Sequence, residues 1–247
     1  ASLTENLAHP FLRTFFGVDL REPLPCEFSV SGPVAAEVAG RDVWETDVAR
    51  FGVNAWLTIQ ALTTGKRISQ VNLGFRGEGS IDPGAPLDTR FLHSVGTLFR
   101  MLTTHHRLWR SNPPVRRIAV QGDNDSDEPI SSRQQVRPLI EALYQAQKDY
   151  GPAWQQILSA ETMDQLLAHL GESKEAFSFP LPLWVRIVTE FAVIFNRGEG
   201  DPDKVIEALL PLFYGRTAHY ILQSEGMPAS QRLTLADQVT RGFVTAK

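Results

Sequence analysis

The stretch VNAWLTIQALTTGKRISQVNLG, from Val53 to Gly74, gives the clearest indication of the fold class. Its first half predicts a helix over residues 53–64 that ends at Gly65. The positions that share one face of this helix are Val53, Trp56, Leu57, Gln60 and Ala61. Ile68, Val71 and Leu73 then predict a strand, and residues 75–86 are rich in glycine and proline and predict a loop. A helix followed directly by a strand is typical of an α/β crossover, in which the loop after the strand faces a ligand.

The residues before this stretch mix helical and strand-like patterns. Apolar residues at helical spacing predict a helix over 3–15, with Gly17 as its C-cap. Residues 27–31 (EFSVS) alternate and predict a short strand, after which a helix can begin at Gly32 and Pro33. We therefore expect the first 86 residues to form an α/β unit.

The pattern becomes helical after residue 86. One apolar stripe predicts a helix running to about Trp109, and it consists of Phe91, Val95, Leu98, Phe99 and Leu102. Residues 111–132 are polar and carry an acidic run, which predicts a flexible surface loop. Further helices are expected near 133–150, 160–170, 182–197, 202–210, 211–224 and 229–244, with prolines at or near their starts. Residues 87–247 should therefore form a helical extension, and the chain should be mostly helical overall.

Composition restricts the classes of function. The chain has 247 residues, a net charge of −4 and a pI near 5.9, which argues against nucleic-acid binding because phosphate contacts need a basic surface. Its single cysteine, Cys26, excludes an internal disulfide and favours a reducing, cytoplasmic location. No apolar run is long enough for a transmembrane helix. The lack of an initiator methionine is a first indication that the sequence is a piece of a longer protein.

Common catalytic and metal-binding motifs are absent from the sequence. His105 and His106 are adjacent and point about 100° apart on a helix, which favours a plain surface pair over a metal site. His93 is expected to be an ordinary helix residue, and Cys26 has no basic neighbour that would activate it as a nucleophile. The acidic run over 123–128 lacks the glycine and the final glutamate of a calcium loop.

Three carboxylates in the first part of the chain are better candidates. Glu27 opens the predicted strand, and Glu78 and Asp82 lie in the glycine-rich loop after the second strand. Carboxylates at strand ends suit metal binding, sugar-hydroxyl binding or general-base catalysis. The alternative is that each one caps a turn.

Five stretches together resemble a known family. The first is VWETDVARFGVNAWLTIQALTTGKRISQVNLG, from Val43 to Gly74. The others are GEGSIDPGAPLD (77–88), RFLHSVGTLFRML (90–102), FPLPLWVRIVTEFAVIF (179–195) and LLPLFYGRTAHYIL (209–222). This combination resembles bacterial GT-A glycosyltransferases of the mannosylglycerate and glucosyl-3-phosphoglycerate synthase type. The resemblance covers nearly the whole chain and implies the acceptor-side half of a GT-A domain over 1–86, followed by the helical C-terminal extension of that family.

The resemblance also implies roles for individual residues. Glu27 falls where the family shapes its acceptor pocket, and Asn54 falls where the family has a catalytic or acceptor-orienting acid. Glu78 falls at a position that completes a divalent-metal site for Mg²⁺ or Mn²⁺, and Arg216 is placed to reach an anionic group of the acceptor. A structural arginine that caps a helix or pairs with an acid is the alternative for Arg216. Most metal ligands would belong to an N-terminal nucleotide-binding half that this sequence lacks.

The sequence also departs from the family pattern. Asn54 cannot take a proton, although its amide can still bind a hydroxyl, and Pro25–Cys26 replaces two glycines. The leading hypothesis is a fragment of an enzyme that transfers a hexose from a nucleotide-sugar donor to a small polar, glycerate-like acceptor. The alternative is a non-catalytic interaction or regulatory module of the same origin. The helical extension is long enough to bury a partner surface, so a homo-oligomer is left open.

Overall fold

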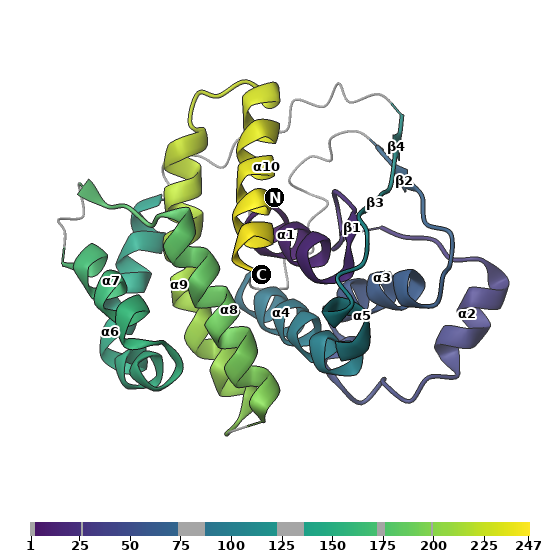
Figure 1. Ribbon diagram of the computed structural model, residues 1–247, viewed down its shortest axis with the longest axis horizontal. Coiled ribbons are helices and arrows are strands. Elements are labelled where there is room, and N and C mark those ends of the chain that lie inside the picture. Colours follow the sequence, from purple (N-terminus) through teal and green to yellow (C-terminus); the bar gives the residue numbers. More distant parts are fainter. Residues whose placement is uncertain (1–2, 26, 74–86, 123–135, 172–175, 199) are drawn as a thin grey trace.

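The fold is described from a computed structural model (Figure 1), which covers residues 3–25, 27–73, 87–122, 136–171, 176–198 and 200–247. Helices dominate these residues, which confirms the prediction of a mostly helical chain. The helices are η1 (Thr4–Ala8), α1 (His9–Phe11), η2 (Leu12–Phe16), α2 (Gly32–Ala39), η3 (Asp47–Ala49), α3 (Val53–Thr63), α4 (Leu87–Thr104), α5 (His106–Arg110), α6 (Val136–Ile157), α7 (Ala160–Leu170), α8 (Leu181–Arg197), α9 (Pro202–Ser224) and α10 (Ala229–Ala246). The strands are β1 (Val18–Asp19), β2 (Gln70–Val71), β3 (Arg116–Arg117) and β4 (Val120–Gln121).

The N-terminal helical segment runs through η1, α1 and η2 without a break, and the predicted helix over 3–15 is confirmed. Its face of Leu7, Phe11 and Leu12 is completely buried. Gly17 ends it in the left-handed region at φ +64°, as expected for a C-cap. A side chain at this position would also meet the backbone oxygen of Pro113 at 2.8 Å, so the glycine admits a close chain crossing.

The C-terminal helices form the main body, in which α9 packs along α6 and α8 (Figure 1). Two completely buried tryptophans anchor this packing. The indole Nε1–H of Trp154 donates to the carbonyl of Ala208 at 2.7 Å, and that of Trp184 donates to the carbonyl of Asn6 at 2.7 Å. The second bond ties α8 to the N-terminal segment. The helices predicted near 160–170, 182–197 and 229–244 are confirmed.

Two predicted helix boundaries at prolines are wrong. Residues 202–210 and 211–224 form the single helix α9, with Pro211 inside it, and Pro152 lies inside α6. Leu209, Leu212 and Phe213 are completely buried on both sides of Pro211. Burial of this continuous apolar face therefore outweighs the one backbone hydrogen bond that the proline cannot make.

The apolar stripe predicted after residue 86 is buried in α4 at each of its five positions. The helix ends earlier than predicted, at Thr104, because His105 leaves the helical region at φ −112° and ψ 32°. The short helix α5 follows and contains Trp109.

The strands are shorter than the sequence suggests. They form two parallel pairs, β1 with β3 and β2 with β4. The predicted strand over 27–31 is wrong: these residues have no regular secondary structure, and Phe28 and Val30 are exposed. The strand predicted around Ile68 to Leu73 is present only as Gln70–Val71. The helix expected from Gly32 and the helix expected from Val53 are both confirmed, as α2 and α3.

One cluster of buried apolar residues connects α1, α3 and α4 with the C-terminal helices. Within the described ranges, no helix is long and apolar enough to cross a membrane. The predicted boundary near residue 86 lies among residues outside the described ranges, as does the acidic run over 123–128.

Candidate functional site

Two predicted acceptor residues belong to the part of the chain around α3. Asn54 is half-buried in the first turn of this helix, and Glu27 is exposed in the extended segment that precedes α2. The hydroxyl of Thr58, one turn after Asn54, donates to the carbonyl of Pro23 at 3.1 Å. This bond ties the turn that leads to Glu27 against the face of α3 that follows Asn54. The chain four residues before Glu27 is therefore held against α3, one turn after Asn54.

Glu78, the metal ligand that the resemblance implies, cannot be placed relative to Glu27 and Asn54. Glu78 and Asp82, together with Cys26, lie outside the described residues. Among the residues that the structure does describe, no three His, Cys, Asp or Glu side chains are grouped to hold a metal ion. The metal site thus stays a prediction from the resemblance.

Arg216 lies in the interior of the molecule. It is 1% exposed; its Nε–H donates to Oδ1 of Asn6 at 2.8 Å, and an Nη1–H donates to the carbonyl of Phe179 at 3.3 Å. Its guanidinium also lies 5.9 Å from the ring centre of Tyr220, and burial lowers the pKa of Arg216 to about 10. These contacts connect α9 to the N-terminal segment and to the residues before α8. They fit the alternative of a structural arginine, since an acceptor outside the molecule has no access to it.

Tyr214, two residues before Arg216 on α9, contacts a residue of α4. Its hydroxyl donates a hydrogen bond to Asp88, in the first turn of α4. Burial and the Asp88 carboxylate raise the pKa of Tyr214, so the phenol stays protonated. This pair joins α9 to α4 at the end of α4 that follows the predicted glycine-rich loop.

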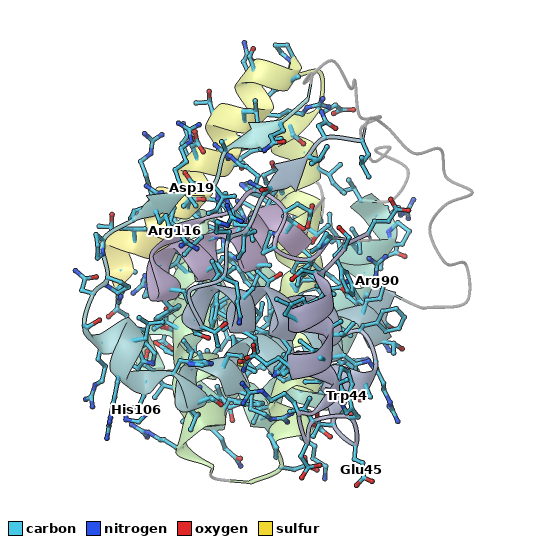
Figure 2. The ribbon with its side chains drawn as sticks, turned by 90° about the vertical axis from the view of Figure 1, so that its right-hand side faces the viewer. Asp19, Trp44, Glu45, Arg90, His106 and Arg116 are labelled. Atoms are coloured by element: carbon cyan, nitrogen blue, oxygen red, sulfur yellow. The ribbon has the colours of Figure 1, made fainter. Side chains whose placement is uncertain are left out.

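The β2–β4 pair carries exposed apolar residues on both of its faces, because its register places Val71 opposite Gln121 and Val120 opposite Gln70. We call the group formed by Val71, Leu73 and Val120 the strand face. Val71 is 57% exposed, Leu73 69% and Val120 39%, although Val71 and Val120 belong to a parallel strand pair. Helix α2, on the right of Figure 1, has no buried residue. Exposed Phe28 and Trp44 belong to the same part of the chain, and Figure 2 shows Trp44 with Glu45 at a lower corner of the molecule.

The parallel arrangement makes this exposure unusual. Parallel strands are almost always covered on both faces by other elements, whereas antiparallel sheets can leave one face to water. Large exposed apolar areas mark surfaces that bind another polypeptide or a ligand. Sequence reasoning missed the strand face because β4 lies in a stretch that was predicted to be a loop.

Sequence reasoning also missed a buried polar cluster that joins both ends of the chain. The Nε2 atom of His9 lies 2.9 Å from Oδ1 of Asp19, and its Nδ1 atom lies 3.3 Å from the hydroxyl of Thr240. Arg13 pairs with the other carboxylate oxygen of Asp19 at 3.3 Å. Figure 2 shows Asp19 near Arg116 of β3, which pairs with Val18, while Asp19 itself pairs with Arg117.

The charges in this cluster are set by burial and pairing. Burial lowers the pKa of His9 and outweighs the hydrogen bond to Asp19. Burial alone would raise the pKa of Asp19, but the bond from His9 and the charges of Arg13 and Arg21 hold it below its ordinary value. A neutral His9 that donates through Nε2 leaves Nδ1 as an acceptor 3.3 Å from the Thr240 hydroxyl, which donates to the carbonyl of Ala236 at the shorter distance of 3.0 Å.

This order of hydroxyl, imidazole and carboxylate is similar to a hydrolase triad, but His9 is 3% exposed and Thr240 4%. A substrate has no access to either group, so the cluster joins α1, β1 and α10.

No protein-family model, curated protein or solved structure matches the chain. The resemblance to GT-A glycosyltransferases therefore rests on the quoted stretches of sequence.

Proposed function

We propose that the chain is the acceptor-side and helical part of a GT-A hexosyltransferase, and that its strand face packs against the nucleotide-binding half of the enzyme. The exposed parallel strand pair is the observation that carries this proposal. Parallel sheets are almost always covered on both faces, whereas Val71 and Leu73 on one face of the β2–β4 pair and Val120 on the other are exposed, so further elements would cover both faces. The α/β half of a GT-A domain would supply such a sheet.

The order of the elements supports the same proposal. Helix α3 leads directly into β2, which pairs in parallel with β4, as in the crossover units of α/β domains. In open α/β sheets, ligands bind beyond the carboxyl ends of the strands. In the sequence, Glu78 and Asp82 come after β2.

The proposed chemistry gives Glu78, Glu27 and Asn54 a role each. The nucleotide-binding half would hold the donor diphosphate and most ligands of a Mg²⁺ or Mn²⁺ ion, with Glu78 as a further ligand. Stabilising the leaving diphosphate by the metal and by fixed charges would provide most of the rate enhancement. Glu27 and Asn54 would orient an acceptor hydroxyl. Asn54 would do so by hydrogen bonding alone, because an amide cannot accept the proton.

The test is hexose transfer by the protein encoded in the complete reading frame that contains this chain. UDP- and GDP-hexoses are incubated with Mg²⁺ or Mn²⁺ and glycerate, and both transfer and donor hydrolysis are measured. Asn54→Ala and Glu27→Gln should each lower kcat/KM by about a hundredfold, since misplacing a reacting group costs about this much. Glu141→Gln, an exposed acid on α6 that pairs with Arg137, is the matched control and should have no effect.

A second function is favoured by one observation. Helix α2 buries none of its residues, as an element of a surface that binds another protein would. A folded full-length protein that neither transfers nor hydrolyses any donor would contradict the enzyme and support this interaction module. Donor hydrolysis that is insensitive to Asn54→Ala and Glu27→Gln would contradict only the roles given to these two residues.

A further inference from the structure

Helix α2, at the edge of the molecule in Figure 1, lacks the packing that stabilises most short helices. None of its eight residues is buried, although its sequence, GPVAAEVA, is almost entirely apolar. Isolated helices of fewer than about 12 residues are marginal in water, because most helical stability in proteins comes from packing an apolar face against other elements. Val38 packs partly against the core, whereas Ala35, Ala36 and Ala39 are exposed. The exposed side of α2 therefore has no cover among the residues that the structure describes.

The chain after α2 presents a fixed aromatic side chain. The backbone N–H and the hydroxyl of Thr46 both donate to the carbonyl of Val43, at 3.2 and 2.7 Å, and close a tight turn. Trp44 and Glu45 occupy the two central positions of this turn, and Figure 2 shows both at a corner of the molecule. The ring of Trp44 packs edge-on against the buried Trp56 at 5.9 Å, yet Trp44 is 40% exposed. A fixed and exposed tryptophan is typical of the residues that anchor protein–protein interfaces.

Helix α3 holds both α2 and this turn. Glu37 on α2 pairs at 2.8 Å with Lys66, which follows α3, and Trp44 contacts Trp56 within α3. The two segments therefore lie along the same helix. We call the exposed side of α2 together with the turn the α2 surface, and it shares no residue with the strand face.

The turn carries negative charge. Residues 42–47 (DVWETD) contain three carboxylates and no basic residue. The side chains of Asp42 and Glu45 are exposed, and among the described residues no basic side chain lies within 4.0 Å of either one. A cation beside Trp44 would therefore meet an aromatic ring and two carboxylates that have no ion pair of their own.

The cations of this part of the chain have other contacts. Arg41 and Lys66 both pair with Glu37, at 3.0 and 2.8 Å. The guanidinium of Arg50 lies 3.4 Å from Nε2 of His93. None of the three forms an ion pair with the exposed carboxylates of the turn. The charge of these carboxylates is therefore available to a partner.

We propose that the α2 surface docks a basic segment of another polypeptide. Lys or Arg side chains of the partner lie against Trp44 and pair with Asp42 and Glu45, and its apolar side chains cover α2. Charge complementarity selects this partner over a second copy of the chain, because a symmetric dimer would bring two acidic turns to one interface. The proposal gives the interaction function a partner of defined chemistry and does not depend on hexose transfer.

The test is fluorescence anisotropy of labelled synthetic peptides titrated with the chain. One peptide is an amphipathic helix of leucine and lysine, and the other has the same pattern with glutamate in place of lysine. The lysine peptide should bind saturably, and the glutamate peptide should not. Hydrogen exchange is then measured with and without the lysine peptide. Amides of α2 should exchange at least about tenfold more slowly in the complex, whereas those of α6 should be unchanged.

Three variants separate the α2 surface from general charge effects. Trp44→Ala should weaken binding of the lysine peptide by at least about tenfold, as expected for an anchoring tryptophan. Asp42→Asn combined with Glu45→Gln should weaken it by about three- to tenfold, the range expected for two exposed ion pairs. This double variant changes only exposed side chains, so it tests the proposal even if Trp44→Ala does not fold. Glu141→Gln combined with Asp164→Asn removes the same charge from exposed positions on α6 and α7 and should leave binding unaltered.

Several results would contradict the proposal. It is wrong if the lysine peptide does not bind saturably, or if the glutamate peptide binds equally well. It is also wrong if the two double variants bind alike. A chain that dimerises without peptide and protects α2 in the dimer would identify a second copy as the partner and would also overturn it. None of these measurements uses hexose transfer, so a failure of docking is distinguishable from a failure of the proposed enzyme.

Discussion

Gly215 offers a sharp test of how closely α6 and α9 pack. A Cβ atom added at this position would lie 2.6 Å from Cδ2 of Leu143, and 2.9 and 3.1 Å from two ring atoms of Phe179. Both neighbours are completely buried, so neither can move aside without disturbing the core. Glycine is therefore required here by the close approach of two helices.

The expected effect of Gly215→Ala is the sum of two opposing terms. Alanine has a higher helix propensity and would stabilise α9 by about 1 kcal/mol. Overpacking a rigid core costs about 1–3 kcal/mol, and a 2.6 Å contact lies toward the upper end of this range or beyond it. We expect a net loss of about 2 kcal/mol in the free energy of unfolding, which lowers Tm by about 4–8 °C in a chain of this size.

The measurement is urea unfolding followed by tryptophan fluorescence, with Gly242→Ala as the matched control. The Cβ of that variant would meet Cδ2 of the half-buried Leu181 at 3.0 Å, a flexible side-chain end that can move. Its stability should therefore stay within about 0.5 kcal/mol of the wild type. In a Leu143→Ala background, Gly215→Ala should cost clearly less, because the closest contact is gone. Equal stability of Gly215→Ala and the wild type would refute the close packing of α6 and α9.

Three further predictions concern other parts of the helical body. Burial and nearby positive charge lower the pKa of His219 to about 4, so between pH 6.5 and 4 the unfolded chain binds a proton that the folded chain does not. Stability should fall as the pH drops through this window, and His219→Gln should flatten the decrease in urea midpoints. Trp154→Phe should lose about 2 kcal/mol in urea unfolding, because the carbonyl of Ala208 loses its donor in the core; an unchanged midpoint would contradict this. Ser159→Ala removes the side-chain acceptor for the backbone N–H of Thr162 at the start of α7. It should lower Tm by an amount equivalent to about 1 kcal/mol. Ser230→Ala leaves this cap intact and should lower Tm less.

The sequence predicted the elements that are specified by residues close to one another in the chain. The stripe from Phe91 to Leu102 repeats at the helical period, and all of it is buried in α4. Gly17 ends its helix because few other residues adopt a positive φ without strain. Such features depend on residues a few positions apart, which a single sequence displays directly.

Features that depend on distant neighbours were not predicted. The alternation over 27–31 suits a strand, but a strand must pair with a neighbouring strand, and no strand of the described residues pairs with this segment. The sequence predicts a helix start at Pro211, but the burial of apolar residues on both sides of this proline keeps α9 continuous. For the candidate site, the sequence predicts Glu27 and Asn54 as acceptor residues, and only the structure shows the bond between Thr58 and Pro23 that holds the chain before Glu27 against α3. It left the role of Arg216 open, because its partner Asn6 is 210 positions away.

The contact between His9 and Thr240 also has a consequence for synthesis of the protein. The two residues are 231 positions apart, and ribosomes add about 5–20 residues per second. The N-terminal helix therefore waits on the order of 10–50 s before α10, which covers it, has been translated. During this time the apolar face of Leu7, Phe11 and Leu12 lacks its native cover and is open to chaperones that bind nascent chains. This helix is thus translated long before the helix that encloses it.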